Sequence, residues 1–395
     1  MNEDNLLVEL IDSINKIVRN KSNEKEFIPL HEPSFLNTKA KSNVNDCIDS
    51  GWVSSAGTWV NNFEHALCDL TKSKNAIAVV NGTVALRLAL YLSGVRPGDE
   101  VLVTPLTFIA TVNAISHLGA FPHFIDIESD TLGISPVSLE NRLNEIATSK
   151  GNHLYNKFTN RKISAILPVH VFGNPINIGE LLEISERWNI PIVEDAAEAL
   201  GSWHKNNTKK VHCGLSGKVG ILSFNGNKII TTGGGGALIT NDSELAQQAR
   251  HLSTTAKIPH AWNFFHDEIG WNDRMPNINA ALGCAQLEAF PEILSRKKEL
   301  TLNYRNMLSK FDFIEILHES ESSVSNNWLV TIRIKSRDDS LAYDYQQKLL
   351  KISHSKRILL RPAWQPLHTL PIYSKNPRGL LANAEYQAKR LINLP

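Results

Sequence analysis

The sequence predicts an α/β protein built on a largely parallel sheet. Short runs of apolar and β-branched residues recur through the middle of the chain, and helical segments separate most of them. Continuous apolar runs are typical of strands that helices cover on both faces. Sheets of this kind bind ligands at the carboxyl ends of their strands, so we expect the functional residues there.

Seven segments are predicted to be strands of this sheet, with helices such as residues 85–92 and 181–188 between them. Residues 52–57 are predicted to form a loop, because glycine and small residues interrupt any period there. Residues 151–160 are polar and are predicted to form a surface loop. The predicted strands are residues 76–80, 100–103, 122–125, 165–168, 192–194, 220–224 and 236–240.

The two ends of the chain differ from this central pattern. Between Leu6 and Val18, apolar residues recur at helical spacing, which predicts a helix that packs on the body or on a partner subunit. Its mixed charges are not those of a membrane-surface helix. Residues 20–25 are predicted to be a polar linker. Residues 1–26 are therefore predicted to be an N-terminal helical extension.

A change of composition after residue 288 predicts a second domain. We expect a helix that runs to about Leu308, followed by strands at residues 328–334 and 357–360. The predicted organisation, after the N-terminal extension, is a large α/β domain over residues 27–288 and a smaller α+β domain over residues 289–395.

Composition excludes several classes of protein. With 395 residues, 42% of them hydrophobic, the chain can bury a sizeable core. Lysine and arginine number 41 against 40 acidic residues, so nucleic acid is not an expected partner. The four cysteines are spaced neither as disulfide pairs nor as zinc ligands. We therefore expect a protein of the reducing cytoplasm without a metal. The acidic N-terminus and the lack of a run of 18 apolar residues predict neither a signal peptide nor a membrane span.

The chain is organised around one lysine. Lys228 ends the stretch Ser223-Phe224-Asn225-Gly226-Asn227-Lys228, and the four glycines 233–236 follow it. It lies on a tight connection between two predicted buried strands. Desolvation lowers the pKa of an amine, and a neutral amine can attack a carbonyl and move protons. The alternative is a surface lysine on a glycine-rich hairpin.

Three other positions are candidates for ligand binding. At Asn81-Gly82-Thr83 a strand turns into a helix, where Thr83 as N-cap, free amides and the helix dipole favour a phosphate; the alternative is an ordinary capped helix. The carboxylates of Glu194, Asp195 and Glu198 follow a buried strand and need a partner, either a protonated aromatic nitrogen or a basic side chain. Phe108 is placed to stack on a planar ligand, or else lies in the core.

Taken in chain order, these motifs resemble the sugar aminotransferases of the DegT/DnrJ/EryC1/StrS family. The resemblance runs from about Phe27 to the end of the chain, and the combination is far more specific than any single motif. Residues 27–30 and 51–55 resemble more narrowly the LegC-like branch, which acts in legionaminic acid or bacillosamine synthesis. The motifs are Gly82-Thr83, Thr107-Phe108, His170-Val171-Phe172-Gly173, Glu194-Asp195-Ala196-Ala197-Glu198, Ser223 to Lys228, Gly233 to Gly236, and Gly270-Trp271-Asn272-Asp273-Arg274.

The resemblance implies a pyridoxal 5'-phosphate enzyme with the fold of aspartate aminotransferase (fold type I). Lys228 would bind the cofactor covalently, and Asp195 would keep its pyridine nitrogen protonated. Glu198 would lie beside the phenolic oxygen, and Phe108 would stack on the ring. Gly82, Thr83 and Ser223 would hold the phosphate, joined by Asn272 of the neighbouring subunit, which makes a homodimer the smallest complete catalyst.

The implied reaction moves an amino group from glutamate to the 4-keto carbon of a nucleotide-linked 4-keto-6-deoxy sugar, for which an N-acetylated hexosamine is expected. The product would enter bacterial surface polysaccharide or nonulosonic acid. Trp52, Ser54, Trp364 and His368 are expected to contact the sugar nucleotide, although the segment from Trp364 to His368 also fits a turn ordered by proline. His170 is expected to be structural.

Two rival functions fit the same fold. One is a sugar dehydratase, in whose 3-dehydratase branches we would expect histidine at the position of Lys228. The other is a binding or regulatory protein that has lost its chemistry. Lys228 favours amino transfer over both, because a binding protein needs no lysine that transfers protons.

Overall fold

The computed structural model describes residues 3–19, 26–206 and 209–395, so the predicted linker at residues 20–25 lies outside the described residues. Each strand predicted for the central sheet has a counterpart close to its predicted position, because apolar and β-branched residues fill these pleated, buried positions. The strands are β1 (Asn75–Val79), β2 (Glu100–Val103), β3 (Phe121–Phe124), β6 (Lys162–Leu167), β7 (Val193–Asp195), β10 (Val219–Ser223) and β11 (Gly236–Thr240).

Most neighbouring strands of the sheet are parallel, as the sequence predicts. β2 pairs in parallel with β3 and β6, and β7 pairs in parallel with β10. Bridges between Ile166 and Ile192 and between Val169 and Asp195 join β6 to β7. β11 lies between β1 and β10 and is antiparallel to both. The segment between β10 and β11 contains no helix, and a short connection of this kind joins strands in antiparallel order.

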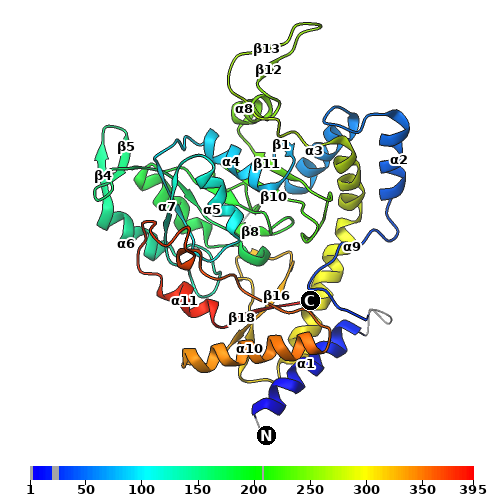
Figure 1. The fold of residues 1–395 in the computed structure, drawn as a ribbon, viewed down its shortest axis with the longest axis vertical. Helices are drawn as coiled ribbons and strands as arrows, with labels where there is room; N and C mark the ends of the chain where they lie inside the picture. Colours follow the sequence, from blue (N-terminus) through cyan, green and yellow to red (C-terminus); the bar gives the residue numbers. More distant parts are fainter. Residues whose placement is uncertain (1–2, 20–25, 207–208) are drawn as a thin grey trace.

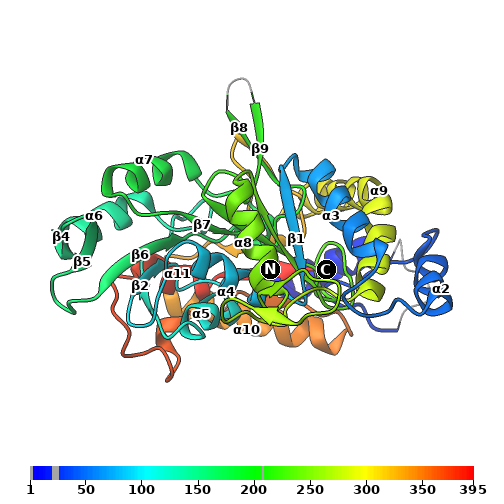
Figure 2. The same cartoon turned by 90° about the horizontal axis from the view of Figure 1, so that it is seen from above.

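Helices cover both faces of the sheet (Figures 1 and 2). On one face lies α4 (Gly82–Leu92), which packs on β10 and β11 and on α5 (Ile109–Ser116) and α8 (Ser243–Ser253). Adjacent residues of β11 enter two different cores: Leu238 packs with the α4 side chains, and Ile239 packs with those of α3 (Thr58–Thr71). Alternation of this kind is the signature of a strand buried on both faces.

The prediction of a surface loop at residues 151–160 is wrong. β4 (Ala147–Lys150) and β5 (His153–Asn156) form a hairpin, and β5 adds antiparallel to the edge of β6. The polar residues of this segment have partners in the fold: the Asn156 side chain is buried and donates to Oε2 of Glu100 at 2.9 Å. A polar composition alone therefore did not distinguish a loop from an edge hairpin.

The C-terminal part of the chain forms a second, smaller sheet. Its strands are in the order β14 (Ile314–Ile316), β16 (Val330–Ile334), β18 (Leu391–Leu394) and β17 (Arg361–Pro362). The strand predicted at 357–360 is wrong, since Ile358 makes only an isolated bridge, to Ile28, and the strand begins after it. A bridge pairs one residue, too few to define a strand.

One long helix connects the two sheets. α9 (Asn277–Leu308) runs without a break from the sheet helices to the C-terminal sheet and contains Pro291 (Figure 1). The predicted boundary after residue 288 falls inside α9, so the domain limits stay a prediction. Both the helix predicted to end near Leu308 and the strand predicted at 328–334 are present.

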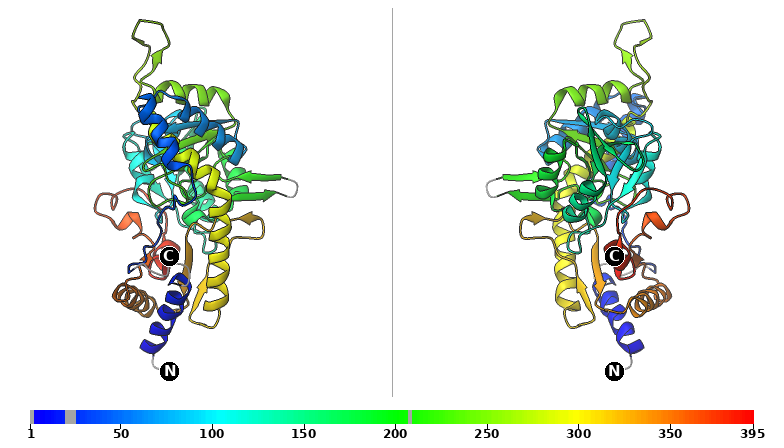
Figure 3. Two further views of the ribbon diagram at one scale, coloured as in Figure 1. Left: turned by 90° about the vertical axis from the view of Figure 1, so that its right-hand side faces the viewer. Right: turned by 90° about the vertical axis from the view of Figure 1, so that its left-hand side faces the viewer.

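α1 (Glu3–Arg19) packs on the C-terminal sheet rather than standing apart. It lies beside α9 and α10 (Asp339–Ser355) (Figures 1 and 3). Leu7, Leu10 and Ile14 of α1 are fully buried in a core shared with β16 and β18. The prediction that this helix packs on the body is confirmed.

A narrow hairpin stands out from the body above the sheet (Figures 1 and 3). It is built on β12 (Lys257–Ile258) and β13 (Phe265–His266). Large apolar side chains on and beside it are exposed: Trp262 by 77%, Phe264 by 80% and Ile269 by 88%. Single exposed apolar residues are common on proteins, whereas this hairpin carries several close together in the sequence.

The remaining elements complete the layers around the two sheets. Among the described residues, no helix is both long and apolar enough to cross a membrane. The remaining helices and strands are α2 (Ala40–Ser50), α6 (Pro136–Ile146), η1 (Val171–Gly173), α7 (Ile178–Trp188), β8 (Trp203–Asn206), β9 (Lys209–His212), β15 (Ser323–Val324), η2 (Leu367–Thr369) and α11 (Ala382–Ala388).

Candidate active site

A cavity of about 740 Å³ opens at the carboxyl ends of β7 and β10, where the C-terminal sheet meets the central sheet. This is the edge at which a parallel sheet binds its ligands. The cavity brings together most of the residues singled out in the sequence. Those that line it are Gly82, Thr83, Phe108, Asp195, Glu198, Ser223, Lys228 and Trp364.

Lys228 lies inside this cavity rather than on an exposed hairpin. Its side chain is 12% exposed, and Nζ lies 3.0 Å from Oε1 of Glu198. Nζ also lies 4.5 Å from the centre of the Trp328 ring, at cation–π distance. The indole nitrogen of Trp328 donates to the carbonyl oxygen of Asn227 at 2.9 Å. Trp328 thus holds both the amine and the backbone that carries it.

Glu198 is held from two sides. Its second oxygen, Oε2, accepts a hydrogen bond of 2.8 Å from the backbone N–H of Phe172. Phe172 adopts a φ of +56°, a left-handed conformation that costs about 1–3 kcal/mol for a residue with a bulky side chain. Its ring stacks on Trp364 with centres 4.9 Å apart. Burial raises the pKa of Glu198, and the charge of Lys228 opposes that shift.

Asp195 ends β7 with its carboxylate buried. Oδ2 accepts from the hydroxyl of Thr111 at 2.7 Å, and Oδ1 accepts from the backbone N–H of Ala197 at 3.1 Å. Burial raises the pKa of Asp195, and the Thr111 hydrogen bond only partly opposes this. Both hydrogen-bond donors are neutral. A protonated ring nitrogen would supply the cation that a buried carboxylate needs.

The start of α4 can bind an anion, but its N-cap is not the predicted residue. Asn81, not Thr83, caps the helix: Oδ1 of Asn81 accepts from the N–H of Val84 at 2.8 Å. The extended backbone of Asn81 suits a cap, whereas Thr83 lies inside the first turn. A Cβ on Gly82 would come within 2.9 Å of Cβ of Ser223. Glycine therefore lets this turn close against Ser223, with a small cradle between them.

Phe108 precedes α5, and the alternative that it lies in the core is wrong. Its side chain is 52% exposed, although it lines the cavity. An aromatic ring that is exposed at the mouth of a cavity can stack on a planar ligand. The lysine, the buried carboxylate, the cradle and the ring all fit pyridoxal phosphate.

His170 has the structural surroundings that the sequence analysis expected. It is fully buried, and Nε2 lies 3.0 Å from Oε2 of Glu194. Glu194 also accepts hydrogen bonds from the backbone amides of Gly214, Ser216 and Gly217. Burial opposes ionisation, yet the hydrogen bonds from His170 and the amides lower the pKa of Glu194 to about 2. The Glu194 carboxylate thus ties the loop of residues 214–217 to the end of β7.

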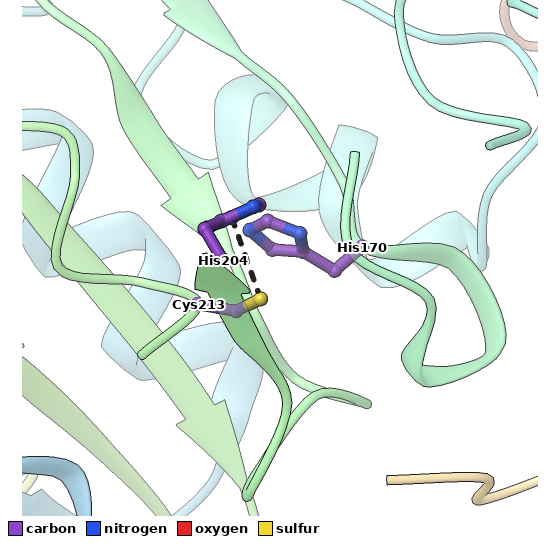
Figure 4. Close-up of side chains that lie close together, drawn as sticks. All are labelled: His170, His204 and Cys213. Atoms are coloured by element: carbon purple, nitrogen blue, oxygen red, sulfur yellow. Dashed lines mark hydrogen bonds between the residues drawn. The ribbon is translucent and has the colours of Figure 1, made fainter. Parts of the chain in front are cut away.

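His204 and Cys213 lie next to His170 (Figure 4). Sγ of Cys213 lies 3.5 Å from Nε2 of His204. Two imidazoles and a thiol are metal-ligand types. However, Nε2 of His170 is engaged by Glu194 and Nδ1 accepts from the N–H of Ile176, and burial raises the pKa of the Cys213 thiol. We therefore describe these side chains as a hydrogen-bonded core.

Four predicted site residues do not line the cavity of their own chain. Asn272 is exposed, next to the buried Asp273, and its backbone bridges to Thr254. Nε2 of His368 lies 2.9 Å from a carboxylate oxygen of Glu385. Trp52 and Ser54 lie in a loop whose backbone oxygens accept from Asn277, which begins α9.

Several residues that line the cavity were missed in the sequence. Trp328, Thr111 and Arg361 contribute to its walls, as does His31. Nε2 of His31 lies 2.9 Å from the carbonyl oxygen of Lys228. Burial contributes most to lowering the pKa of His31 to about 3, and the charge of Lys297 lowers it further. The ring is therefore neutral, and its N–H can donate to that oxygen. The motif 27–31 was a signal for His31, but nothing near Trp328 in the sequence pointed to Lys228.

The fold and the site together define an α/β enzyme of the pyridoxal-phosphate class. The DegT/DnrJ/EryC1/StrS aminotransferase family model matches residues 35–395, and this chain belongs to that family. The protein is thus an aminotransferase that depends on pyridoxal phosphate, with the fold type that the resemblance implied.

Individual relatives agree with this assignment. The chain is 36% identical to a GDP-perosamine synthase of Escherichia coli O157:H7, over 94% of this chain and 93% of that protein. It is 37% identical to a putative pyridoxal phosphate-dependent aminotransferase, EpsN, of Bacillus subtilis, over 86% and 82% of the two chains. The structure of PseC of Helicobacter pylori, an aminotransferase involved in pseudaminic acid biosynthesis, superposes with a TM-score of 0.81 at 25% identity over 93% of each chain.

A second lysine behind the site leads to a prediction about pH. Nζ of Lys297, in α9, donates to the carbonyl oxygen of Trp328 at 2.9 Å. Burial lowers the pKa of Lys297 from 10.5 to about 8. Its charged form therefore destabilises the folded protein below pH 8, and this cost disappears as the pH rises towards 10.5. Wild type should gain stability relative to Lys297→Met across that range.

Urea unfolding at several pH values measures this gain. Lys298→Met is the matched control, because Lys298 is the exposed neighbour of Lys297. The difference in unfolding free energy between wild type and Lys298→Met should not change with pH. Free energies of unfolding that change in parallel with pH for wild type and Lys297→Met would contradict the prediction.

Proposed function

We propose that this protein transfers an amino group from glutamate to the 4-keto carbon of a nucleotide-linked 4-keto-6-deoxy sugar. The observation that carries the proposal is the position of Lys228, buried in one cavity with Asp195 and Glu198. The relatives support the substrate class, since several are named GDP-perosamine synthase.

Each cavity residue has a role in this proposal. The pyridoxal phosphate ring, when bound, accepts the electron pair that a departing substrate proton leaves behind. Asp195 keeps the ring nitrogen protonated, and Phe108 stacks on the ring. Gly82, Thr83 and Ser223 hold the phosphate. Lys228 binds the cofactor and then accepts and returns the substrate proton, which is general acid–base catalysis by one amine.

The sugar nucleotide is proposed to bind at the open side of the cavity. Trp364 and Arg361 line the cavity, and Arg361 supplies a cation there. Trp52, Ser54 and His368 are further proposed contacts. An N-acetylated hexosamine is proposed from residues 27–30 and 51–55, which resemble the LegC-like branch. The product would serve bacterial surface polysaccharide or nonulosonic acid synthesis in the cytoplasm.

The proposed reaction is tested with a panel of substrates. The protein is incubated with glutamate and 4-keto-6-deoxy sugars linked to UDP, GDP or dTDP, and the products are separated by mass. We expect 2-oxoglutarate and one aminated sugar nucleotide. Loss of a hydroxyl group without amination would instead favour the rival dehydratase function.

The role of Lys228 is tested by substitution. Lys228→Ala and Lys228→Arg should lower turnover by at least about 10²–10⁴-fold, because the amine transfers the proton. Circular dichroism and melting should show that both variants fold. Borohydride should link the cofactor to the Lys228 peptide of wild type only. Formation of 2-oxoglutarate at the wild-type rate by either variant would refute the role.

A homodimer with shared active sites is part of the proposal. Asn272 is exposed while Asp273 and Arg274 beside it are buried, and it lies outside the cavity of its own chain. The hairpin with Trp262 and Phe264 exposes the apolar area that a second copy would cover. Asn272 would then reach the phosphate in the partner's cavity.

Hybrid dimers test this arrangement. Lys228→Ala and Asn272→Ala are each expected to be inactive alone. If Asn272 acts across the interface, a mixed dimer contains one site with both residues intact, and activity returns. A mixture of Lys228→Ala with Lys228→Arg is the control and should stay inactive. No recovery in the first mixture, measured after confirming that dimers exchange, would place Asn272 outside the partner's site.

A further inference from the structure

Lys228 and Glu198 form a short, shielded ion pair. Nζ and Oε1 are 3.0 Å apart, and the two side chains are 12% and 6% exposed. Trp328 covers the amine with its ring face, which favours the charged form of the lysine. In this state the pair is stable as ammonium and carboxylate, and the ammonium cannot attack a carbonyl.

The surroundings of Glu198 make its charge depend on Lys228. The charged or polar groups that face it are Lys228, the backbone N–H of Phe172 and the carboxylate of Asp195. Burial raises the pKa of Glu198, Asp195 raises it further, and Lys228 is the largest opposing influence. Once the lysine loses its charge, only the Phe172 amide still favours an ionised Glu198.

We propose that Glu198 takes the proton of Lys228 when the lysine becomes a nucleophile. One proton moves from Nζ to Oε1 along the existing hydrogen bond, which leaves a neutral amine and a carboxylic acid. The amine nitrogen forms its bond to the aldehyde carbon of the cofactor, and its two remaining hydrogens leave with the carbonyl oxygen as water. The inference rests on the proposed role of Lys228 as the cofactor lysine.

Protonation changes what Glu198 can do. As a carboxylate it accepts from Lys228 and from Phe172, and it has no hydrogen to give. As an acid it keeps the Phe172 bond at Oε2 and gains one donor at Oε1. Glu198 then supplies a hydrogen bond within the cavity that the ionised residue cannot make. Oε1 is the oxygen that receives the proton, because it already accepts from Nζ of Lys228 while Oε2 accepts from Phe172.

Infrared difference spectra test the proposal directly. Spectra of wild type with and without pyridoxal phosphate should show a carboxylic-acid carbonyl band that appears on loading and shifts in heavy water. The band should be missing in Glu198→Gln, which has nearly the same shape but no titratable proton. Melting curves confirm that the variant folds. No new band in loaded wild type, or a band that persists in Glu198→Gln, would overturn the proposal.

A second measurement needs neither cofactor nor turnover. In Lys228→Ala, Glu198 loses its cation, so the acid band should be present before loading and absent from Lys228→Ala/Glu198→Gln. An ionised Glu198 in Lys228→Ala would overturn the coupling between the two residues. Borohydride could instead link the cofactor to another lysine. That result would refute the proposed role of Lys228 but not the coupling between the charge of Lys228 and the protonation of Glu198, so the two failures are distinguishable.

Discussion

The ion pair between Lys228 and Glu198 is the constraint around which the cavity is built. Keeping two charges out of water is costly unless each has further partners, and both residues have them. Trp328 covers the lysine, and Phe172 bonds the carboxylate. The amide of Asn326 donates to the carbonyl oxygen of Glu198 at 2.8 Å, which fixes the backbone as well. Without Lys228, the buried carboxylate of Glu198 would have no cation beside it, and burial would favour its protonated form.

The site is shared between distant parts of one chain. The central sheet supplies the carboxylates and the lysine, whereas the segment that leads into β16 of the second sheet supplies Asn326 and Trp328. His31, from the N-terminal side, bonds the backbone of Lys228. The catalytic geometry thus requires that both sheets fold and meet, which links the activity of the site to the stability of the whole molecule.

Features that depend on neighbouring residues in the chain were predicted from the sequence. Buried strands appear as apolar runs because both their faces are covered, and Lys228 was found through the motif around it. The cap of α4 was misassigned because Asn81 and Thr83 are both good capping residues, and backbone direction chooses between them.

Other features depend on contacts between distant segments. Trp328 lies 100 residues from Lys228 in the chain, so no local pattern joins them. Residues 151–160 look like a loop until Glu100 provides a partner for Asn156. The individual roles of the site residues came from family resemblance rather than from spacing or composition.

The continuity of α9 limits how the cavity can open. This helix is common to both sheets, and Pro291 is its one interior proline. Proline removes a helical hydrogen bond and weakens the turn that precedes it. If the two sheets move relative to each other, bending of α9 is therefore expected near Pro291. A continuous helix between the two sheets thus limits their relative motion to what bending at this one turn allows.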